Sequence, residues 1–297
     1  MPWLQLTLEA THSNSEQLSE LLTQAGASAV TMQDAHDEPI FEPPPGSTPL
    51  WKELLLTGLF EADADMDAIL KSIEKGFGSL PNYTLNPLED KDWIREWMDN
   101  FKPMPFGERL WICPSWHEPP QPDAVNIMLD PGMAFGTGTH PTTSLCLKWL
   151  DQHFHQPVDV IDYGCGSGIL GIAASLLGSQ RVYAVDLDPQ ALIATQANAE
   201  KNQVQNQIET LSVNEFNKKH PDLQCPLLLA NILAAPLMEL SSILAAHVLP
   251  GGHIVLSGIL AEQADKVASC YKKWFELDEI EQEGDWIHIS GTKKEVS

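Results

Sequence analysis

The chain has 297 residues, of which 43% are hydrophobic, so it is long enough to bury two separate cores. Its 41 acidic residues against 17 basic residues give a formal net charge of -24. A chain this acidic is not expected to bind bare nucleic acid or a membrane surface, and it favours a basic partner unless the acids only solvate the surface.

The first 88 residues are predicted to form a small α+β domain. Apolar and polar residues alternate as in half-buried strands, and leucines recur at helical spacing between them. The expected order is strand, helix, strand, strand and helix, over residues 3–9, 15–24, 29–33, 52–60 and 65–77. This order is typical of a ferredoxin-like split sandwich. Residues 1–120 contain 20 acids and 7 bases, so a domain over 1–88 suits the recognition of a basic substrate.

Residues 89–122 are expected to link this domain to a second one. Trp93, Trp97 and Phe101 recur at steps of four residues and predict a short helix with a bulky apolar face. Several prolines follow and end the helical pattern. We expect the helix to pack between the domains rather than to contact a ligand.

A run rich in glycine and threonine, DPGMAFGTGTHPTT at residues 130–143, opens the second domain, which is expected over 123–297. The two threonines that end the run can cap the following helix, which explains part of the pattern. Capping does not explain Phe135, Gly136 and Thr137, which are placed to fold over a bound ligand. His140 is either a ligand contact or a structural histidine.

A strand, a glycine turn and a helix are predicted over residues 158–174. Mostly apolar residues lead to Asp162, Gly164, Gly166 and Gly168 follow, and an apolar run with helical spacing comes next. Glycines let the backbone bend sharply and let a ligand lie directly on the main chain, where the N–H groups of a helix start point outward. The turn therefore predicts a binding site for a flat or polar ligand, with a purely structural turn as the alternative.

Asp186 ends the next predicted strand, 20 residues after Gly166, where its carboxylate is expected to meet a ribose with two free hydroxyls. NAD and S-adenosylmethionine both present such a ribose. Dinucleotide sites use the spacing G-x-G-x-x-G, whereas the glycines here follow G-x-G-x-G with Asp162 in front. Because this carboxylate would repel a pyrophosphate and suits a cationic ligand, the pattern favours S-adenosylmethionine over NAD.

The rest of the chain alternates between helices and strands, as expected for a mostly parallel sheet. Helices are expected over 189–202 and 261–274, and strands over 208–213, 226–230, 252–257, 275–281 and 286–290, the last at the edge of the sheet. The apolar strand 226–230 stops at Asn231. Ligands of such sheets lie at the carboxyl ends of the strands, so Asn231 is expected to face the same crevice as Gly164 and Asp186.

The cysteines and the amino terminus indicate the compartment. The cysteines lie far apart and form neither a C-x-x-C pair nor a metal-ligand pattern: Cys113, Cys146, Cys165, Cys225 and Cys270. They predict free thiols in a reducing compartment and no metal site. The sequence starts without a basic signal-like segment, and no apolar run approaches 18 residues, so we expect a cytoplasmic protein.

Several of these motifs resemble a known family. DYGCGSG at 162–168 and the later Asp186 resemble a class I S-adenosylmethionine-dependent methyltransferase. The run DPGMAFGTGTHPTT, NILA at 231–234 and the acidic front domain resemble the ribosomal protein L11 methyltransferase (PrmA) family. The resemblance implies a Rossmann-like, seven-stranded α/β methyltransferase domain over 123–297, a smaller N-terminal α+β domain over 1–88 and a helical linker over 89–122.

The resemblance also implies a reaction and a site. Members transfer methyl groups from S-adenosylmethionine to lysine side-chain and N-terminal amines of ribosomal protein L11, a basic partner. No direct contact with nucleic acid or a membrane is expected, and the chain is expected to be a monomer. Thr143, Gly164, Asp186 and Asn231 match the family's cofactor positions, and residues 135–139 would cover the methionine end of the cofactor.

Methyl transfer to an amine needs few groups from the protein, because the methyl of a sulfonium is already activated. The amine must be neutral, aligned with the methyl and shielded from water. Asn231 is the expected catalytic residue, since its side-chain oxygen can accept a hydrogen bond from the amine. No general base stands out in the sequence.

Two alternatives belong to other classes. A methyltransferase of nucleic-acid amines would place an aromatic side chain near Asn231 to stack on a flipped base, but Ile-Leu-Ala follows here and the chain is acidic. The other alternative is a nucleotide-binding scaffold without enzymatic activity.

Overall fold

The computed structural model describes residues 3–36, 40, 49–88, 101–130 and 140–295. The chain divides into two compact units, Met1–Trp97 and Met98–Ser297, which are described separately below. None of the helices in the described part of the chain is both long and apolar enough to cross a membrane.

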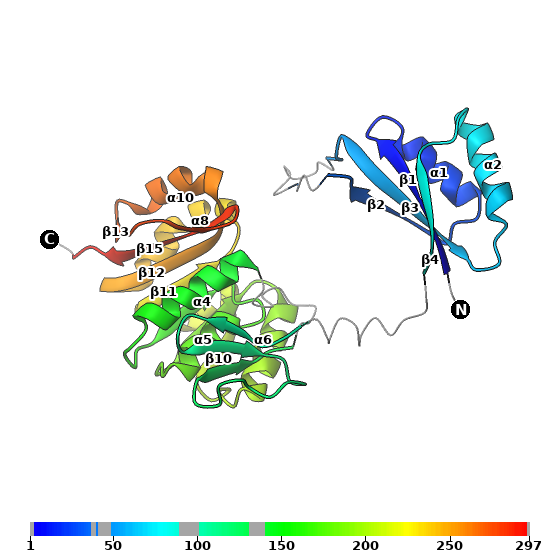
Figure 1. The fold of residues 1–297 in the computed structure, drawn as a ribbon. Helices are drawn as coiled ribbons and strands as arrows, with labels where there is room; N and C mark the ends of the chain where they lie inside the picture. The colour runs from blue at the N-terminus through cyan, green and yellow to red at the C-terminus, as the bar shows by residue number, and fades with distance from the viewer. Residues whose placement is uncertain (1–2, 37–39, 41–48, 89–100, 131–139, 296–297) are drawn as a thin grey trace. The chain divides into compact units, whose positions relative to one another are not determined.

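The N-terminal unit is a four-stranded antiparallel sheet with two helices on one face (Figure 1). Its strands lie in the order β2-β3-β1-β4, which is the ferredoxin-like arrangement predicted from the sequence. The fourth strand, β4, had not been predicted. The elements are β1 (Trp3–Thr11), α1 (Ser15–Gln24), β2 (Ala29–Asp34), β3 (Glu53–Glu61), α2 (Met66–Phe77) and β4 (Tyr83–Leu88).

Alternation along the central strands explains this packing. Leu6 and Leu8 of β1 and Leu54 and Leu56 of β3 are buried beneath α1 and α2. Asp65 starts α2 by accepting a hydrogen bond from the backbone N–H of Ala68 at 3.0 Å.

The C-terminal unit is built on one large sheet with helices on both faces (Figure 1). A three-stranded sheet of β5, β6 and β7 precedes it in the chain. The first elements are β5 (Met104–Phe106), β6 (Leu110–Cys113), β7 (Val125–Met128), α4 (Pro141–His153), β8 (Val160–Tyr163), α5 (Ile169–Leu176), β9 (Val182–Asp186), α6 (Pro189–Lys201), β10 (Ile208–Ser212) and α7 (Val213–Lys219). The remaining elements are β11 (Cys225–Asn231), α8 (Ala234–Glu239), α9 (Ser241–Ala246), β12 (Val248–Leu260), α10 (Ala264–Tyr271), β13 (Phe275–Leu277), β14 (Glu281–Glu283) and β15 (Trp286–Lys293).

The large sheet runs in the order β10-β9-β8-β11-β12-β15-β13, and β14 pairs with β15 as an eighth strand. The first five strands are parallel and β15 is antiparallel to β12. This is the Rossmann-like class that the sequence predicted. One prediction was wrong: β15 is not an edge strand, because β12 and β13 flank it on both sides.

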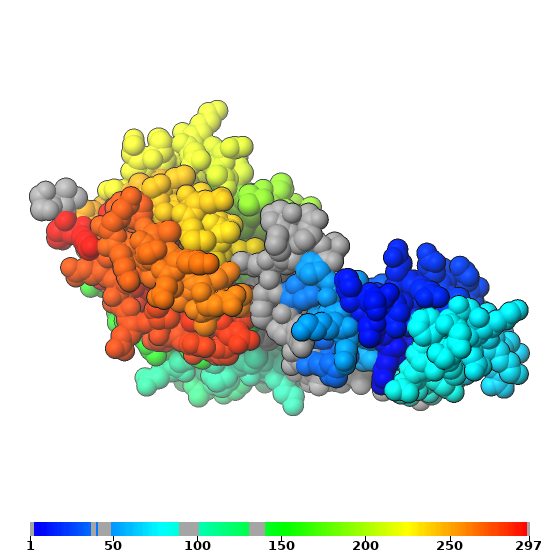
Figure 2. All heavy atoms as spheres, turned by 90° about the horizontal axis from the view of Figure 1, so that it is seen from above, coloured from blue at the N-terminus to red at the C-terminus, as the bar shows by residue number. Residues whose placement is uncertain are grey.

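The segment 261–281 also differs from the prediction in detail. The expected helix 261–274 is a short 3-10 turn followed by α10, and the expected strand 275–281 is divided between β13 and β14. Figure 2 shows the atoms of α10 and of these last strands packed together on one face of the C-terminal unit.

The region expected to link the domains contains regular structure of its own. Residues 104–113 form β5 and β6, which belong to the C-terminal unit, and the two units divide between Trp97 and Met98. The helix predicted around residues 93–101 lies outside the described residues except for Phe101, which is in neither a helix nor a strand.

Candidate functional site

A cavity of about 830 Å³ lies at the carboxyl ends of the parallel strands, inside the range of roughly 300–1,000 Å³ that small-molecule sites occupy. Six of the predicted site residues line it together: Thr143, Asp162, Gly164, Gly166, Asp186 and Asn231. They come from α4, β8, β9, β11 and the turn after β8, so the order of the sheet brings distant parts of the sequence to one place. The predicted residues Phe135, Gly136 and Thr137 lie outside the described residues.

The glycine turn after β8 has the backbone conformation that only glycine adopts easily. Gly164, Gly166 and Gly168 have φ angles of 78°, 56° and 78°. A Cβ atom on Gly164 would lie 2.2 Å from a methyl carbon of Ile232. The turn therefore excludes side chains at these positions and leaves bare main chain on the cavity wall.

Asp186 ties the second strand to this turn. One carboxylate oxygen accepts a hydrogen bond from the backbone N–H of Gly166 and the other accepts one from Asp188, both at 2.9 Å. A carboxylate has about four acceptor positions, so Asp186 can still accept hydrogen bonds from two hydroxyls of a ligand.

Asp162 lies at the end of β8 and is 1% exposed. Burial raises its pKa to about 7, a hydrogen bond from the backbone N–H of Gly171 at 2.9 Å opposes this shift, and the charge of Asp186 adds to it. A carboxyl group with this pKa favours a positive charge beside it, because a cation stabilises the ionised form.

Asn231 ends β11 and contacts Thr143 of α4. Its side-chain nitrogen donates a hydrogen bond to the hydroxyl oxygen of Thr143 at 3.3 Å, and Thr143 is buried. This bond directs the amide nitrogen toward α4. The amide oxygen of Asn231 has no hydrogen-bond partner among the residues that the structure describes.

His140 has two structural roles at the edge of the cavity. Its ring nitrogen Nδ1 accepts a hydrogen bond from the backbone N–H of Thr142 and so caps α4. Its ring also packs edge-on against Trp286 at 4.9 Å between centroids. Burial lowers the pKa of His140. The cap and the ring packing show that His140 is a structural histidine. Because its ring and that of Trp286 line the cavity, His140 can also contact a ligand there.

Sequence reasoning missed several lining residues. Leu187 follows β9, while Ser212, Val213 and Asn214 stand where β10 passes into α7. The rule that ligands lie at the ends of parallel strands could have identified all four. Trp286 begins an antiparallel strand far along the chain, and no sequence signal links it to the cavity.

The two carboxylates give the cavity a definite chemical preference. Asp186 suits a ligand with two neighbouring hydroxyls, and Asp162 suits a positive charge near the bare glycine backbone. Within the described parts of the chain, no group of three or more His, Cys, Asp or Glu residues is placed to hold a metal ion.

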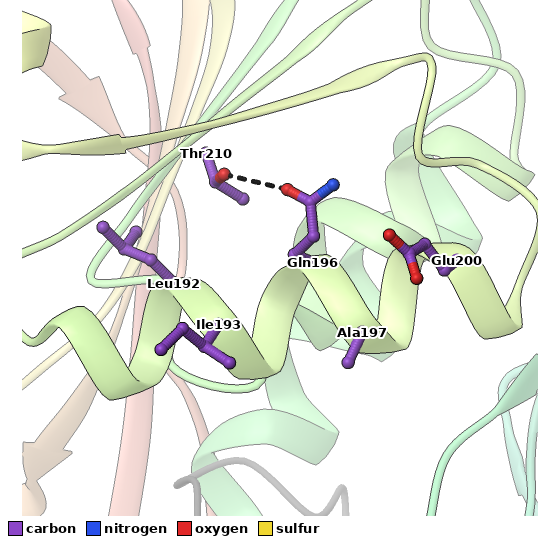
Figure 3. Close-up of a pocket in the computed structure, with 6 residues that line it drawn as sticks. All are labelled: Leu192, Ile193, Gln196, Ala197, Glu200 and Thr210. Carbon is purple, nitrogen blue, oxygen red and sulfur yellow. Dashed lines mark hydrogen bonds between the residues drawn. The ribbon is translucent and has the colours of Figure 1, made fainter.

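A second hollow, of about 390 Å³, lies along α6 (Figure 3). Leu192, Ile193, Ala197 and Gln196 line it, and Gln196 accepts a hydrogen bond from the hydroxyl of Thr210 at 3.3 Å. It contains none of the predicted residues.

The order of the large sheet and the cavity over its glycine turn define a Rossmann-like methyltransferase. Residues 2–294 match the family described as "Ribosomal protein L11 methyltransferase (PrmA)". The chain belongs to this family.

Individual relatives agree with this assignment. The chain is 50% identical to the ribosomal protein L11 methyltransferase of Shewanella sediminis over 99% of its own length and 100% of the relative. It is 51% identical to that of Marinobacter nauticus with the same coverage. Among solved structures, the ribosomal protein L11 methylase of Lactobacillus delbrueckii subsp. bulgaricus is similar, with 32% identity and a TM-score of 0.60 over 66% of this chain and 100% of that one.

Proposed function

We propose that this chain transfers methyl groups from S-adenosylmethionine to lysine side-chain and N-terminal amines of ribosomal protein L11. The observation that carries the proposal is the convergence of Asp186, the glycine turn and Asn231 on one cavity. The names of the relatives, at about half identity over nearly the whole chain, support L11 as the substrate.

The proposal gives each of the predicted site residues a role in binding the methyl donor. Asp186 accepts hydrogen bonds from the ribose hydroxyls, the backbone at Gly164 and Gly166 carries the body of the donor, and Asp162 favours its cationic end. Thr143 fixes the orientation of Asn231. Phe135, Gly136 and Thr137 belong to a segment that covers the methionine end. When bound, the donor supplies an activated methyl group, so the protein has to align the acceptor and exclude water.

The acceptor amine must lose its proton before it reacts. A lysine with a pKa of about 10.4 is neutral in roughly one molecule in 2,500 at pH 7, which costs about 4.6 kcal/mol. Burial favours the neutral form and offsets part of this cost. The amide oxygen of Asn231 accepts a hydrogen bond from the neutral amine and leaves the nitrogen lone pair directed at the methyl group.

The two parts of the chain divide the work. Residues 1–88 recognise the substrate, residues 89–122 connect, and residues 123–297 carry out the transfer. The protein acts in the cytoplasm, which the separated cysteines favour, and it acts as a monomer.

A labelling experiment tests the proposal directly. The protein is incubated with radiolabelled S-adenosylmethionine and either total ribosomal protein or ribosomal RNA, from cells that lack the endogenous activity, and purified L11 is tested alongside. We expect label in L11 and its loss when Asp186 is replaced by alanine. Label in another protein or in RNA, or no transfer at all, would contradict the assignment of the substrate.

A further inference from the structure

The cavity extends over two halves of the large sheet. Asp186 and the glycine turn lie at the ends of β9 and β8, and the proposed function assigns this half to the donor. Asn231 ends β11 on the other half, where β12 and β15 follow in the sheet, and Trp286 at the start of β15 lines the same cavity. The ring of His140 packs edge-on against Trp286. An amine that reaches Asn231 is therefore expected to pass along these two rings.

A short hairpin determines where Trp286 lies. β14 and β15 are joined by a two-residue turn, Gly284 and Asp285, and Glu283 pairs with Trp286 across this turn. Gly284 has a φ of 62°, as hairpin turns of this length require at their first position. Among the strands that the structure describes, β14 pairs only with β15. The position of the hairpin end therefore depends on contacts outside the sheet.

The carboxylate of Glu283 supplies such a contact and joins the hairpin to α4. Its oxygen Oε2 accepts a hydrogen bond from the hydroxyl of Ser144 at 3.0 Å and another from Nζ of Lys148 at 2.6 Å. The two donors lie one helical turn apart on α4. Ser144 directly follows Thr143, whose hydroxyl accepts the hydrogen bond from Asn231. Glu283 therefore connects the hairpin to the helix that orients Asn231.

This ion pair is too exposed to be needed for folding. The side chains of Lys148 and Glu283 are 40% and 39% exposed, and water screens such a pair, so it adds little to the stability of the fold. Alignment of reacting groups is far more sensitive to position, because a displacement of about 1 Å can lower the rate by up to about a hundredfold. A contact of this kind can therefore affect the rate while leaving the fold intact.

We propose that Glu283 is a positioning residue for methyl transfer, which keeps Trp286 against His140 and so maintains the wall along which the acceptor amine enters; this rests on the function proposed above. Glu283 is not among the described residues that line the cavity, so it acts on the amine through Trp286. Its loss should lower kcat. The affinity for S-adenosylmethionine should not change, nor should the capture of L11, which is assigned to residues 1–88.

An exchange of charges tests the proposal in the full-length chain. In Lys148→Glu two carboxylates face each other and push the hairpin away from α4, so kcat should fall at least fivefold, with the KM for L11 and the donor affinity within twofold of the parent. Adding Glu283→Lys restores opposite charges and should return kcat to within twofold of the parent. The control, Lys219→Glu, makes the same charge change beside Glu209 in the same unit and should leave kcat within twofold of the parent.

A double-mutant cycle tests whether Glu283 acts through Trp286. Glu283→Ala, which removes the contact without adding repulsion, should lower kcat at least threefold in the parent. Trp286→Leu should lower kcat by itself, and adding Glu283→Ala to it should lower kcat no further, because no indole ring is left to position. Effects of the two changes that multiply, or a Trp286→Leu variant with the kcat of the parent, overturn the proposal.

The outcomes separate this role from the function on which it rests. A parent protein that transfers no methyl group to L11 overturns the proposed function and the positioning role together. The positioning role alone is overturned if the parent methylates L11 and Lys148→Glu has the same kcat. The same conclusion follows if Lys148→Glu lowers kcat and the addition of Glu283→Lys does not restore it.

Discussion

At the scale of single residues, Asp186 links the fold to the proposed ligand. Its carboxylate holds the glycine turn through Gly166, and the proposed function assigns it the ribose of the donor. Asp186→Ala should weaken binding of S-adenosylmethionine at least tenfold, about 1.4 kcal/mol, as measured by calorimetry. The control is Asp188→Ala, which removes an equal charge two residues away and loses only the hydrogen bond that caps α6. Its donor affinity should stay within threefold of that of the parent. Equal affinities for Asp186→Ala and the parent would refute the role.

Asn231 is tested by changing its charge. In Asn231→Asp a carboxylate stabilises the protonated amine, which has no lone pair with which to attack. Turnover with saturating donor should fall at pH 7 and partly recover toward pH 10, as the amine loses its proton. Asn231→Ala should lower turnover more than donor affinity. A pH 7–10 rate profile of the aspartate variant that overlays the parent's would show that Asn231 does not position the amine.

Asp162 predicts a pH dependence of donor binding. Because burial raises its pKa to about 7, Asp162 is largely protonated at pH 6 and largely ionised at pH 8. The ionised form attracts the cationic donor, so donor affinity should rise several-fold over this interval and binding near pH 7 should release protons. Calorimetry in buffers of different ionisation enthalpy measures both effects. Asp162→Asn should be insensitive to pH in this range, and a variant as steep as the parent would assign the dependence to another group.

At the scale of elements, one buried carboxylate fastens the first strands of the C-terminal unit to α4. Asp151 is 4% exposed and accepts hydrogen bonds from the backbone N–H groups of Glu108, Arg109 and Leu110 at 2.7, 2.9 and 3.1 Å. The guanidinium of Arg109 approaches the same carboxylate at 3.6 Å. At Gly107, where φ is 86°, a side chain would collide with Asp151.

Removing this carboxylate should therefore destabilise the C-terminal unit. Asp151→Ala leaves three backbone N–H groups without their acceptor, while the guanidinium of Arg109 keeps its bonds to backbone carbonyl oxygens; the loss should cost about 3–5 kcal/mol. Hydrogen exchange of peptides from β8 and β9 in increasing urea measures the effect on this unit separately. Asp123→Ala, the loss of an exposed carboxylate, should be nearly neutral. A difference of less than 1 kcal/mol between the two variants would contradict the proposed anchoring.

The sequence predicted those elements whose hydrophobic pattern is local. The glycine turn, Asp186 and Asn231 each follow an apolar strand, so their common location follows from the parallel sheet alone. The position of β15 could not be predicted in this way, because its hydrophobic pattern does not say which strands it pairs with, and it lies between β12 and β13. Trp286 was missed for the same reason. β5 was not predicted, because it contains Pro105 and a proline usually argues against a strand.

At the scale of the whole molecule, the uneven distribution of charge predicts a separation of tasks. A fragment beginning near Asp90 should still bind S-adenosylmethionine, because every described residue of the cavity lies beyond that point. It should fail to methylate L11, because it lacks residues 1–88, which are proposed to recognise the substrate. Transfer assays with the fragment and the full chain make the comparison, and full activity of the fragment would disprove the separation.

Salt provides a second test at this scale. If docking is electrostatic, raising the ionic strength from 0.05 to 0.5 M (about 14 to 4 Å in Debye length) should raise the KM for L11 while donor affinity changes less. A KM for L11 that does not depend on salt would show that charge does not guide capture.

The place of β15 in the sheet also bears on how the protein is made. During synthesis the chain leaves the ribosome from its amino terminus, so the glycine turn, Asp186 and Asn231 emerge before the strand that begins at Trp286. Until then the edge of β12 has no partner and the cavity lacks one of its walls. The nascent chain therefore exposes the unpaired edge of β12 from the time this strand emerges until β15 follows, and it acquires a complete site only when β15 enters the sheet.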